Sequence, residues 1–284
     1  MNVLKYKWFG LLLVCIALGV LGTVTVRAIP NASSLAARQI CGLLYVSHLS
    51  ADDALKTYIN PLLRGFAPFL SWASDPTTRQ VRASIAGFSE AIAVAQPGYG
   101  CLMLTNKTVN EIEMLFPAQP LSAELDNELI PTAVLLENAV QSAMSTPETK
   151  AVLVWHTDAV VAEAYAAGIH PDTPLPALSM AEGLTLTVGS LLAKRQMLAL
   201  DEVALFEEWE EDERVHISLE DLLRGTGGDM SDVSRLITRR LGGPASAQRF
   251  VRDELLTPLG MTRTTLPPGV FSTARDWSRL GRLY

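Results

Sequence analysis

The chain has 284 residues, 49% of them hydrophobic and 19% charged, so it is long enough to bury a full hydrophobic core. Its formal net charge is −7, and leaving out the three cations of residues 1–27 (Lys5, Lys7 and Arg27) changes this to −10. Such an acidic balance argues against nucleic acid and against an anionic membrane surface as partners.

An apolar segment at the N-terminus is the first predicted element. Trp8 to Val26 form a run of 19 uncharged residues, with Lys5 and Lys7 ahead of it. This length can just cross a bilayer core, and the lysines favour a cytoplasmic N-terminus. A cleaved signal peptide is the alternative, because small residues surround Arg27. Either way, residues 1–27 predict an inner-membrane protein with an exported C-terminal part, or a periplasmic protein.

The cysteines predict a disulfide in the exported part. Cys15 lies in the apolar segment, where it is explained as a small packing residue. Cys41 and Cys101 remain, and an even number of cysteines in an oxidising compartment favours pairing. In the chain-entropy estimate this pairing stabilises the fold by about 4 kcal/mol. Two buried free thiols are the alternative.

Residues 28–115 are interpreted as a small exported subdomain. Gly98 and Gly100 indicate a turn between two extended runs, and Ser50 is a candidate N-cap. The expected elements are a helix start within 27–40, a strand over 41–47, a helix over 51–63, extended segments over 81–86 and 90–95, and a further one over 101–104.

Residues 116–284 form the second predicted domain. Helices are expected over 121–145 and over 184–200, the latter as a central buried helix that presents Ser179. Two strands are expected over 150–156 and 160–165. Thr273 and Asp276 have the spacing of a capping box, so another helix should start there.

Ser179 and Glu182 stand three positions apart at the start of the central helix, and a one-turn spacing places both on one helix face. Further segments follow this pair or precede it in a consistent order. They are Lys150–His156, Val160–Tyr165, Gly168–Asp172, Ile217–Gly228, Glu254–Met261 and Ser272–Tyr284. Together they resemble the serine β-lactamase-like hydrolases, the β-lactamase-related and penicillin-binding-protein-like family with a Ser-x-x-Lys motif.

The resemblance implies an α/β fold, a β-lactamase/transpeptidase-like helical cluster on an antiparallel sheet that is incomplete here. It also implies acyl transfer on amides, esters or lactams, with Ser179 at the nucleophile position. Glu182 replaces the family lysine, which would take the proton of the serine hydroxyl. A carboxylate is a weaker base, and its charge opposes the oxyanion formed on attack. An ordinary helix N-cap is the alternative role of Ser179.

Two further family motifs are missing. No tyrosine occurs between Tyr165 and Tyr284, and the chain contains no Lys-Thr-Gly or His-x-Gly. We therefore expect a degenerate, C-terminally truncated and catalytically impaired member. A residual hydrolase, a non-catalytic membrane-tethered binding module and a truncated gene product are the alternatives.

The expected partners are a small acyl substrate or a cell-wall fragment, and the membrane through the N-terminal helix. No cofactor is predicted, because the sequence has no phosphate-binding glycine loop, zinc pattern or dinucleotide fingerprint. Six acids between Glu207 and Glu213 could form a cation site, but without ligand spacing they indicate a solvated loop.

Overall fold

The computed structural model describes residues 22, 28–119, 134–157, 159–266 and 269–284. The chain divides into two compact units, Met1–Ala118 and Gln119–Tyr284. The predicted membrane or signal segment, residues 1–27, lies outside the described residues apart from Gly22. Within the part of the chain that is described, no helix is long and apolar enough to cross a bilayer.

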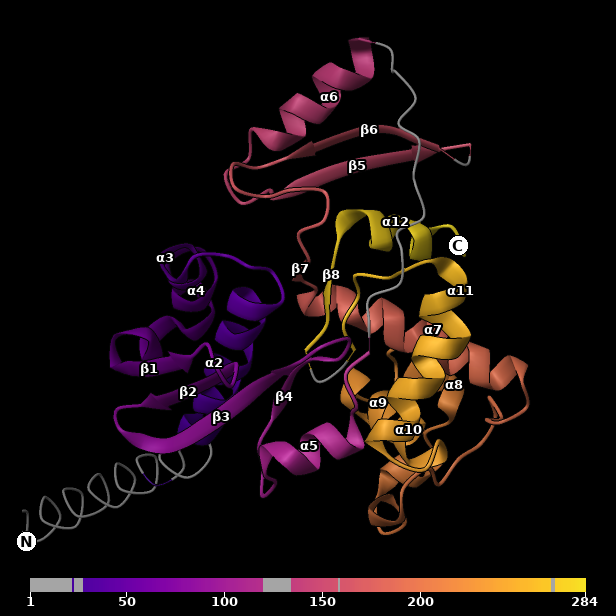
Figure 1. The fold of residues 1–284 in the computed structure, drawn as a ribbon. Coiled ribbons are helices and arrows are strands. Elements are labelled where there is room, and N and C mark those ends of the chain that lie inside the picture. Colours follow the sequence, from indigo (N-terminus) through magenta and orange to yellow (C-terminus); the bar gives the residue numbers. More distant parts are fainter. Residues whose placement is uncertain (1–21, 23–27, 120–133, 158, 267–268) are drawn as a thin grey trace, which may run out of the picture. The chain divides into compact units, whose positions relative to one another are not determined.

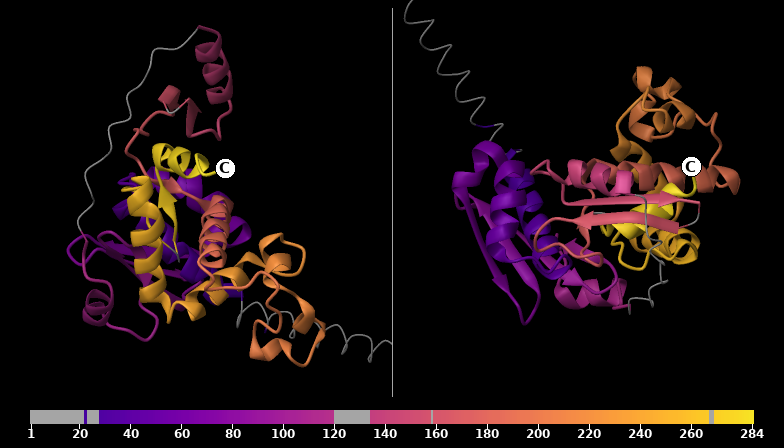
Figure 2. Two further views of the ribbon diagram at one scale, coloured as in Figure 1. Left: turned by 90° about the vertical axis from the view of Figure 1, so that its right-hand side faces the viewer. Right: turned by 90° about the horizontal axis from the view of Figure 1, so that it is seen from above.

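The first unit is one long helix packed on a four-stranded antiparallel sheet (Figures 1 and 2). Helix α2 buries small and aliphatic side chains against the sheet, among them Ala36, Ala37, Ile40 and Leu43. The strands pair in sequence order and are β1 (Leu70–Asp75), β2 (Gln80–Ile85), β3 (Phe88–Gln96) and β4 (Gly100–Met103).

The strand predicted over 41–47 is wrong, because α2 spans Ile29–Tyr45. The buried positions of α2 continue at helical spacing through Ile40, Cys41 and Leu43. A short apolar run has the same composition in a buried strand and in a buried helix segment, so the local pattern could not separate the two.

The other secondary-structure predictions for this unit are confirmed. Ser50 caps the helical region, because its hydroxyl accepts a hydrogen bond of 3.1 Å from the Asp53 N–H. The extended segments are β2 and β3, joined by Ala86 and Gly87, whose φ angles of +52° and +75° suit a two-residue hairpin turn of type I′. The remaining elements are α3 (Ala51–Asp53), η2 (Ala54–Ile59), α4 (Asn60–Leu63), η3 (Arg64–Phe69) and α5 (Val109–Leu115).

A disulfide joins Cys41 and Cys101, as the sequence predicts. It connects α2 to β4, with 6.0 Å between the two Cα atoms. Both cysteines are buried. The bond therefore links the helix layer of this unit to an edge of its sheet.

The second unit contains the hairpin of β5 (Ala151–His156) and β6 (Ala159–Tyr165), the two strands predicted there. Helices α6 (Val134–Met144) and α12 (Ala274–Gly281) contact this hairpin, and Figure 1 shows it between them. The chain therefore belongs to the mixed α/β class with antiparallel sheets, which confirms the coarse fold prediction.

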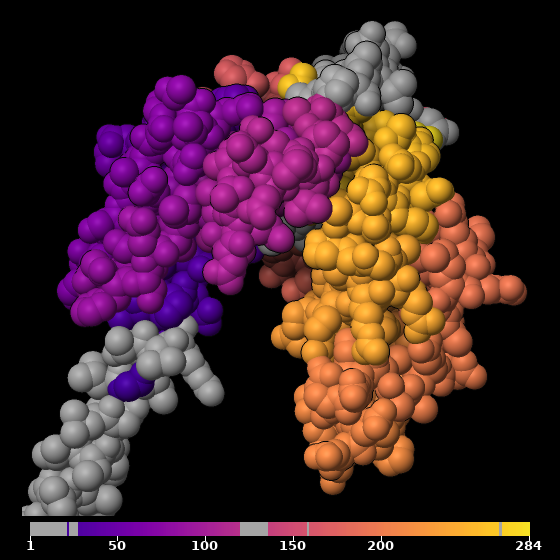
Figure 3. Space-filling model, turned by 60° about the horizontal axis from the view of Figure 1, so that its bottom comes forward, coloured from indigo at the N-terminus to yellow at the C-terminus, as the bar shows by residue number. Residues whose placement is uncertain are grey.

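The core of this unit is formed by helices. The buried cluster joins side chains such as Leu192, Phe206, Leu222 and Leu236. The contributing helices are α7 (Ala181–Lys194), η5 (Glu207–Trp209), α8 (Leu219–Leu223), α9 (Met230–Arg240), α10 (Pro244–Val251), η7 (Arg252–Leu256), α11 (Thr257–Leu259) and α12. The short turn η6 (Glu213–His216) has no buried residue. In Figure 3 the orange-to-yellow surface belongs to the C-terminal part of this unit.

Two helix predictions need correction. The central helix begins at Ala181 and ends at Lys194, instead of spanning 184–200. It stops because Gln196 has a φ of +58° and the Met197 N–H donates back to the Leu192 carbonyl at 2.9 Å. Of the helix predicted over 121–145, α6 covers Val134–Met144. Residues 120–133 lie outside the described part of the chain.

Candidate functional site

Ser179 lies at a strand-to-helix junction. The short strand β7 (Leu175–Pro176) pairs with β8 (Phe271–Ser272), and the Ala177 N–H donates to the Val270 carbonyl at 2.9 Å. A single 3₁₀ turn, η4 (Leu178–Met180), then leads into α7. The segment with Ser179 is thus held by the chain that precedes α12, and the Ser179 side chain is exposed.

Ser179 is not the N-cap of the central helix. Met180 occupies that position, and α7 has no side-chain cap. Within the described part of the chain, no hydrogen bond joins the Ser179 hydroxyl to another residue. The N-cap alternative is therefore wrong, and no base is hydrogen-bonded to this hydroxyl.

The backbone ahead of Ser179 is unusual. Leu178 has a φ of +46° and its side chain is 62% exposed. Positive φ is costly for a side chain with a Cβ, and such residues occur often at functional turns. Ten described non-glycine residues share this feature, so Leu178 alone does not identify a catalytic turn.

Glu182 lies in the first turn of α7 and is exposed. It helps to line a hollow of about 410 Å³, together with Leu186, Leu223, Arg224, Gly225, Gly228, Asp229 and Met230. An acidic side chain in the first helical turn interacts favourably with the helix dipole, where an ammonium group would not. Glu182 therefore has a structural explanation that requires no catalytic role.

The charged groups in this hollow are already engaged or acidic. Asp229 caps α9, and the hydrogen bond from the Ser231 N–H lowers the pKa of its carboxyl. Arg224 pairs with Glu220 at 2.6 Å. No lysine, histidine or tyrosine is among the residues that line the hollow. A group that could replace the amine is therefore missing from these walls.

The loop that contains Gly227 and Gly228 forms one wall of this hollow and packs closely against its neighbours. A Cβ on Gly227 would lie 2.6 Å from Ile217, and one on Gly228 would lie 2.6 Å from Leu222. Both distances are shorter than real Cβ contacts, so side chains do not fit here without movement. The glycines of the predicted 217–228 segment thus allow the loop to close on α8.

A second polar cluster joins β6 to α12. Arg275 donates two hydrogen bonds to the Glu163 carboxylate, at 2.6 and 3.0 Å, and the Tyr165 hydroxyl donates to it at 2.9 Å. Burial alone would raise the pKa of Glu163, but these hydrogen bonds outweigh burial and lower it. Burial and the neighbouring carboxylate raise the pKa of Tyr165. Tyr165 is therefore a hydrogen-bond donor in this cluster.

The structure also shows an aspartate whose role the sequence did not reveal. The Asp276 N–H donates to the Thr273 hydroxyl at 3.0 Å, so the predicted helix start is confirmed. The Asp276 carboxylate does not complete the capping box. It accepts instead from the Arg263 N–H and from the Thr264 hydroxyl, at 2.9 and 2.8 Å, and pairs with Arg279 at 2.6 Å.

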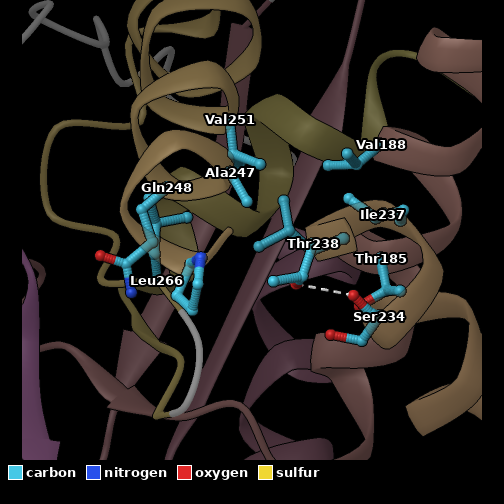
Figure 4. A pocket seen from close by; sticks show the side chains of 11 residues that line it. Thr185, Val188, Ser234, Ile237, Thr238, Ala247, Gln248, Val251 and Leu266 are labelled. Carbon is cyan, nitrogen blue, oxygen red and sulfur yellow. Dashed lines mark hydrogen bonds between the residues drawn. The ribbon is translucent and has the colours of Figure 1, made fainter. Parts of the chain in front are cut away.

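A small apolar cavity of about 80 Å³ lies between α7, α9 and α10 (Figure 4). Aliphatic side chains such as Val188 and Ile237 line it, and the Thr238 hydroxyl at its edge donates to the Ser234 carbonyl at 2.8 Å. Ser179 does not line this cavity or the hollow beside Glu182. The cavity is therefore separate from the candidate serine.

We expect Ala247→Met to stabilise the protein by filling this cavity. Ala247 is buried on α10 and lines the cavity, and each buried methylene group adds roughly 0.8 kcal/mol. Part of this gain is lost to ordering a flexible side chain, so the free energy of unfolding should rise by about 1 kcal/mol. Urea unfolding measures the change. Ala245→Met on the same helix is the control, because Ala245 does not line the cavity; equal effects would contradict the prediction.

Neither a metal site among the described residues nor a matching protein indicates a function for this chain. Within the described ranges, no three His, Cys, Asp or Glu side chains are placed to hold a metal ion, and this includes the acidic segment of η5 and η6. No family model, curated protein or solved structure matches the chain. Any assignment to a family therefore depends on the residues and their arrangement alone.

Proposed function

We propose that this chain is an exported or membrane-anchored protein of the serine β-lactamase-like type whose acyl-transfer activity is impaired. Its relatives would act on amides, esters or lactams. The order of the elements supports the family: an antiparallel hairpin, then a serine ahead of a helix, then a glycine loop against α8. The helix that begins after Thr273 is the last element in this order.

The proposal of impaired activity depends on the groups that surround Ser179. Attack by serine forms a bond from Oγ to the acyl carbon while a base takes the hydroxyl proton, and the leaving atom then needs a proton. Ser179 has no hydrogen bond to a base within the described residues, and one turn later the helix has the exposed Glu182. A carboxylate there would also repel the oxyanion.

The described tyrosines support the same conclusion. Tyr165 donates its hydroxyl to Glu163, and the Tyr284 hydroxyl lies 2.7 Å from the Thr187 hydroxyl. Thr187 lies eight residues after Ser179, which along helical structure corresponds to about 12 Å. Neither phenol forms a hydrogen bond with the Ser179 hydroxyl.

We expect the purified chain to show no covalent labelling by a fluorophosphonate or by a fluorescent penicillin above the level of Ser179→Ala. Labelling reports the first half of acyl transfer, in which Oγ becomes bonded to phosphorus or to the β-lactam carbonyl carbon. An active enzyme with a Ser-x-x-Lys motif, treated in parallel, shows that the probes are reactive. Gel fluorescence and intact-mass spectrometry measure the adduct.

Glu182→Lys tests whether the missing base is the only defect. We expect no labelling of this variant either, because Tyr165 and Tyr284 are hydrogen-bonded to other groups and not to the Ser179 hydroxyl, so the second proton transfer still lacks a donor. Labelling of the unmodified chain that Ser179→Ala abolishes would overturn the proposal. Absence of labelling combined with saturable, Ser179-independent binding of a cell-wall fragment would instead favour the non-catalytic binding module.

A further inference from the structure

Two phenylalanines are exposed at one end of the first unit. Phe69 is 57% exposed and Phe88 is 56% exposed. Phe88 begins β3 directly after the Ala86–Gly87 turn, and the Phe69 carbonyl accepts a hydrogen bond of 2.7 Å from the Ala86 N–H. Both aromatic residues therefore flank the same end of the sheet.

This end of the sheet lies beside the start of α2. The buried Ser33 hydroxyl accepts a hydrogen bond of 3.1 Å from the Ile85 N–H. Ser33 lies in the first turns of α2, and Ile85 stands opposite Phe88 in the β2–β3 register. The other end of the sheet, where residues 76–79 join β1 to β2, is the end away from this contact.

The sequence immediately ahead of α2 is the apolar run that predicts a membrane span or signal segment. Val26 ends this run, and α2 begins at Ile29. If the run crosses a bilayer, the chain leaves the lipid at the N-terminal end of α2. The exposed phenylalanines are at that same end, although a soluble surface would normally cover aromatic side chains of this size.

We propose that Phe69 and Phe88 insert into the interfacial layer of the bilayer to which the chain is anchored. The inference rests on the membrane anchoring contained in the proposed function. Aromatic rings are favoured at the boundary between headgroups and acyl chains. Contact with lipid thus covers two side chains that the first unit leaves exposed, and it fixes the orientation of this unit on the membrane.

The contact is apolar and does not depend on lipid charge. The nearby Glu90 pairs with Arg82 at 3.8 Å, so this end of the sheet has no unopposed positive charge from that pair. Residues 28–118 of this unit contain six basic and six acidic side chains, so they have no net charge that would favour anionic lipid. We therefore expect the two phenylalanines to contact a bilayer of zwitterionic phosphatidylcholine. Added salt should not weaken this contact.

The test places a fluorescent label at the proposed contact in the full chain. Cys15→Ala removes the thiol in the apolar segment, and the disulfide keeps Cys41 and Cys101 unreactive. Phe88→Cys is then labelled with bimane, and the protein is reconstituted in phosphatidylcholine vesicles with or without doxyl-labelled phosphatidylcholine. Thr77→Cys, exposed at the opposite end of the sheet, is the matched control.

We expect doxyl lipid to reduce the emission of the label at position 88 roughly twofold, because interfacial side chains lie about 5–10 Å deep, within reach of the quencher. The label at position 77 should keep its emission, and added salt should change neither result. Phe69→Cys provides a second site on the same end of the sheet, in case the substitution at position 88 disturbs the hairpin.

The outcomes separate this inference from the proposed anchoring. If the protein sediments with vesicles but lipid quenches positions 88, 69 and 77 equally little, the contact is overturned and anchoring stands. Cross-linking of two copies through position 88 without quenching would assign the surface to a second copy and also overturn the inference. Failure to sediment with vesicles would remove both proposals.

Discussion

Replacing Asp276 with alanine is expected to lower the free energy of unfolding by about 3–5 kcal/mol, because it breaks a buried ion pair on one side only. Asp276 is fully buried and its partner Arg279 is 6% exposed. Without the carboxylate, the Arg279 guanidinium stays in the interior and loses the anionic oxygen that lies 2.6 Å from it. Urea unfolding, followed by tryptophan fluorescence and circular dichroism, measures the loss.

The size of the effect comes from the number of groups that depend on one carboxylate. One oxygen accepts from the Arg263 N–H and the Thr264 hydroxyl, and the other pairs with Arg279. Arg279 in turn donates to the Gly260 carbonyl at 2.9 Å. Asp276 thus fixes the loop of residues 260–265 against α12, and its removal takes an acceptor away from three donors at once.

Two further variants make this prediction specific. Asp276→Asn keeps the shape and one carbonyl oxygen but loses the charge, so its loss should be smaller than that of Asp276→Ala. Glu220→Ala breaks the exposed pair with Arg224 and should cost less than about 1 kcal/mol. Equal, small effects of Asp276→Ala and Glu220→Ala would show that the buried pair does not stabilise the unit.

The sequence predicts those elements well whose signals are local. Ser50 and Thr273 both accept the hydrogen bond expected of an N-cap, and the turn after β3 follows from Pro97 and Gly98. Alternation and turn residues likewise identify β2 and β3. In each case the deciding atoms are within a few residues of one another, so tertiary packing does not have to be known.

Predictions failed where long-range packing decides the outcome. Cys41–Ser47 has the composition of a strand, but the sheet that covers this segment comes from residues 70–103, and Cys41–Tyr45 form the last turn of α2. Leu198, predicted within the central helix, packs into the core after the chain has turned at Gln196. The carboxylate of Asp276 bonds to residues that precede it by 12 and 13 positions, which a capping pattern does not reveal.

The sequence predicts where Ser179 and Glu182 lie along the chain, but not which groups surround them in the fold. The sequence indicates Ser179 and Glu182 at the start of a helix, and the structure has both there. It does not indicate that the Ser179 hydroxyl is exposed without an N-cap bond, or that Glu182 borders a hollow lined by the 223–230 loop. Those features depend on how α8 and α9 pack against α7.

Removing the disulfide with the double variant Cys41→Ala/Cys101→Ala is expected to lower the free energy of unfolding by about 4 kcal/mol. The bond closes a loop with a sequence separation of 60 residues, and the chain-entropy estimate for such a loop gives about 4 kcal/mol. Both sulfur atoms are also buried, so their removal leaves a small space between α2 and β4. The double substitution avoids a reactive free thiol in the core.

The effect should be concentrated in one part of the first unit. Among the described strands, β4 lies at the edge of the sheet and pairs with β3 alone. The disulfide adds a covalent cross-link between β4 and α2. The edge-to-face contact of Tyr99 with Phe116, at 5.4 Å between ring centroids, depends on the same region of the chain. Without the bond, hydrogen exchange should accelerate in β4 more than in β2, because local opening begins where few contacts remain.

Cys15→Ala provides the matched control for this prediction, since it also removes a sulfur atom but breaks no cross-link. Its unfolding midpoint should equal that of the unmodified chain, whereas the double variant should unfold at clearly lower urea concentration. Addition of a reductant should bring the unmodified chain to the midpoint of the double variant. If reduction leaves the midpoint unchanged, the disulfide does not stabilise the folded chain relative to the unfolded one, and the prediction is wrong.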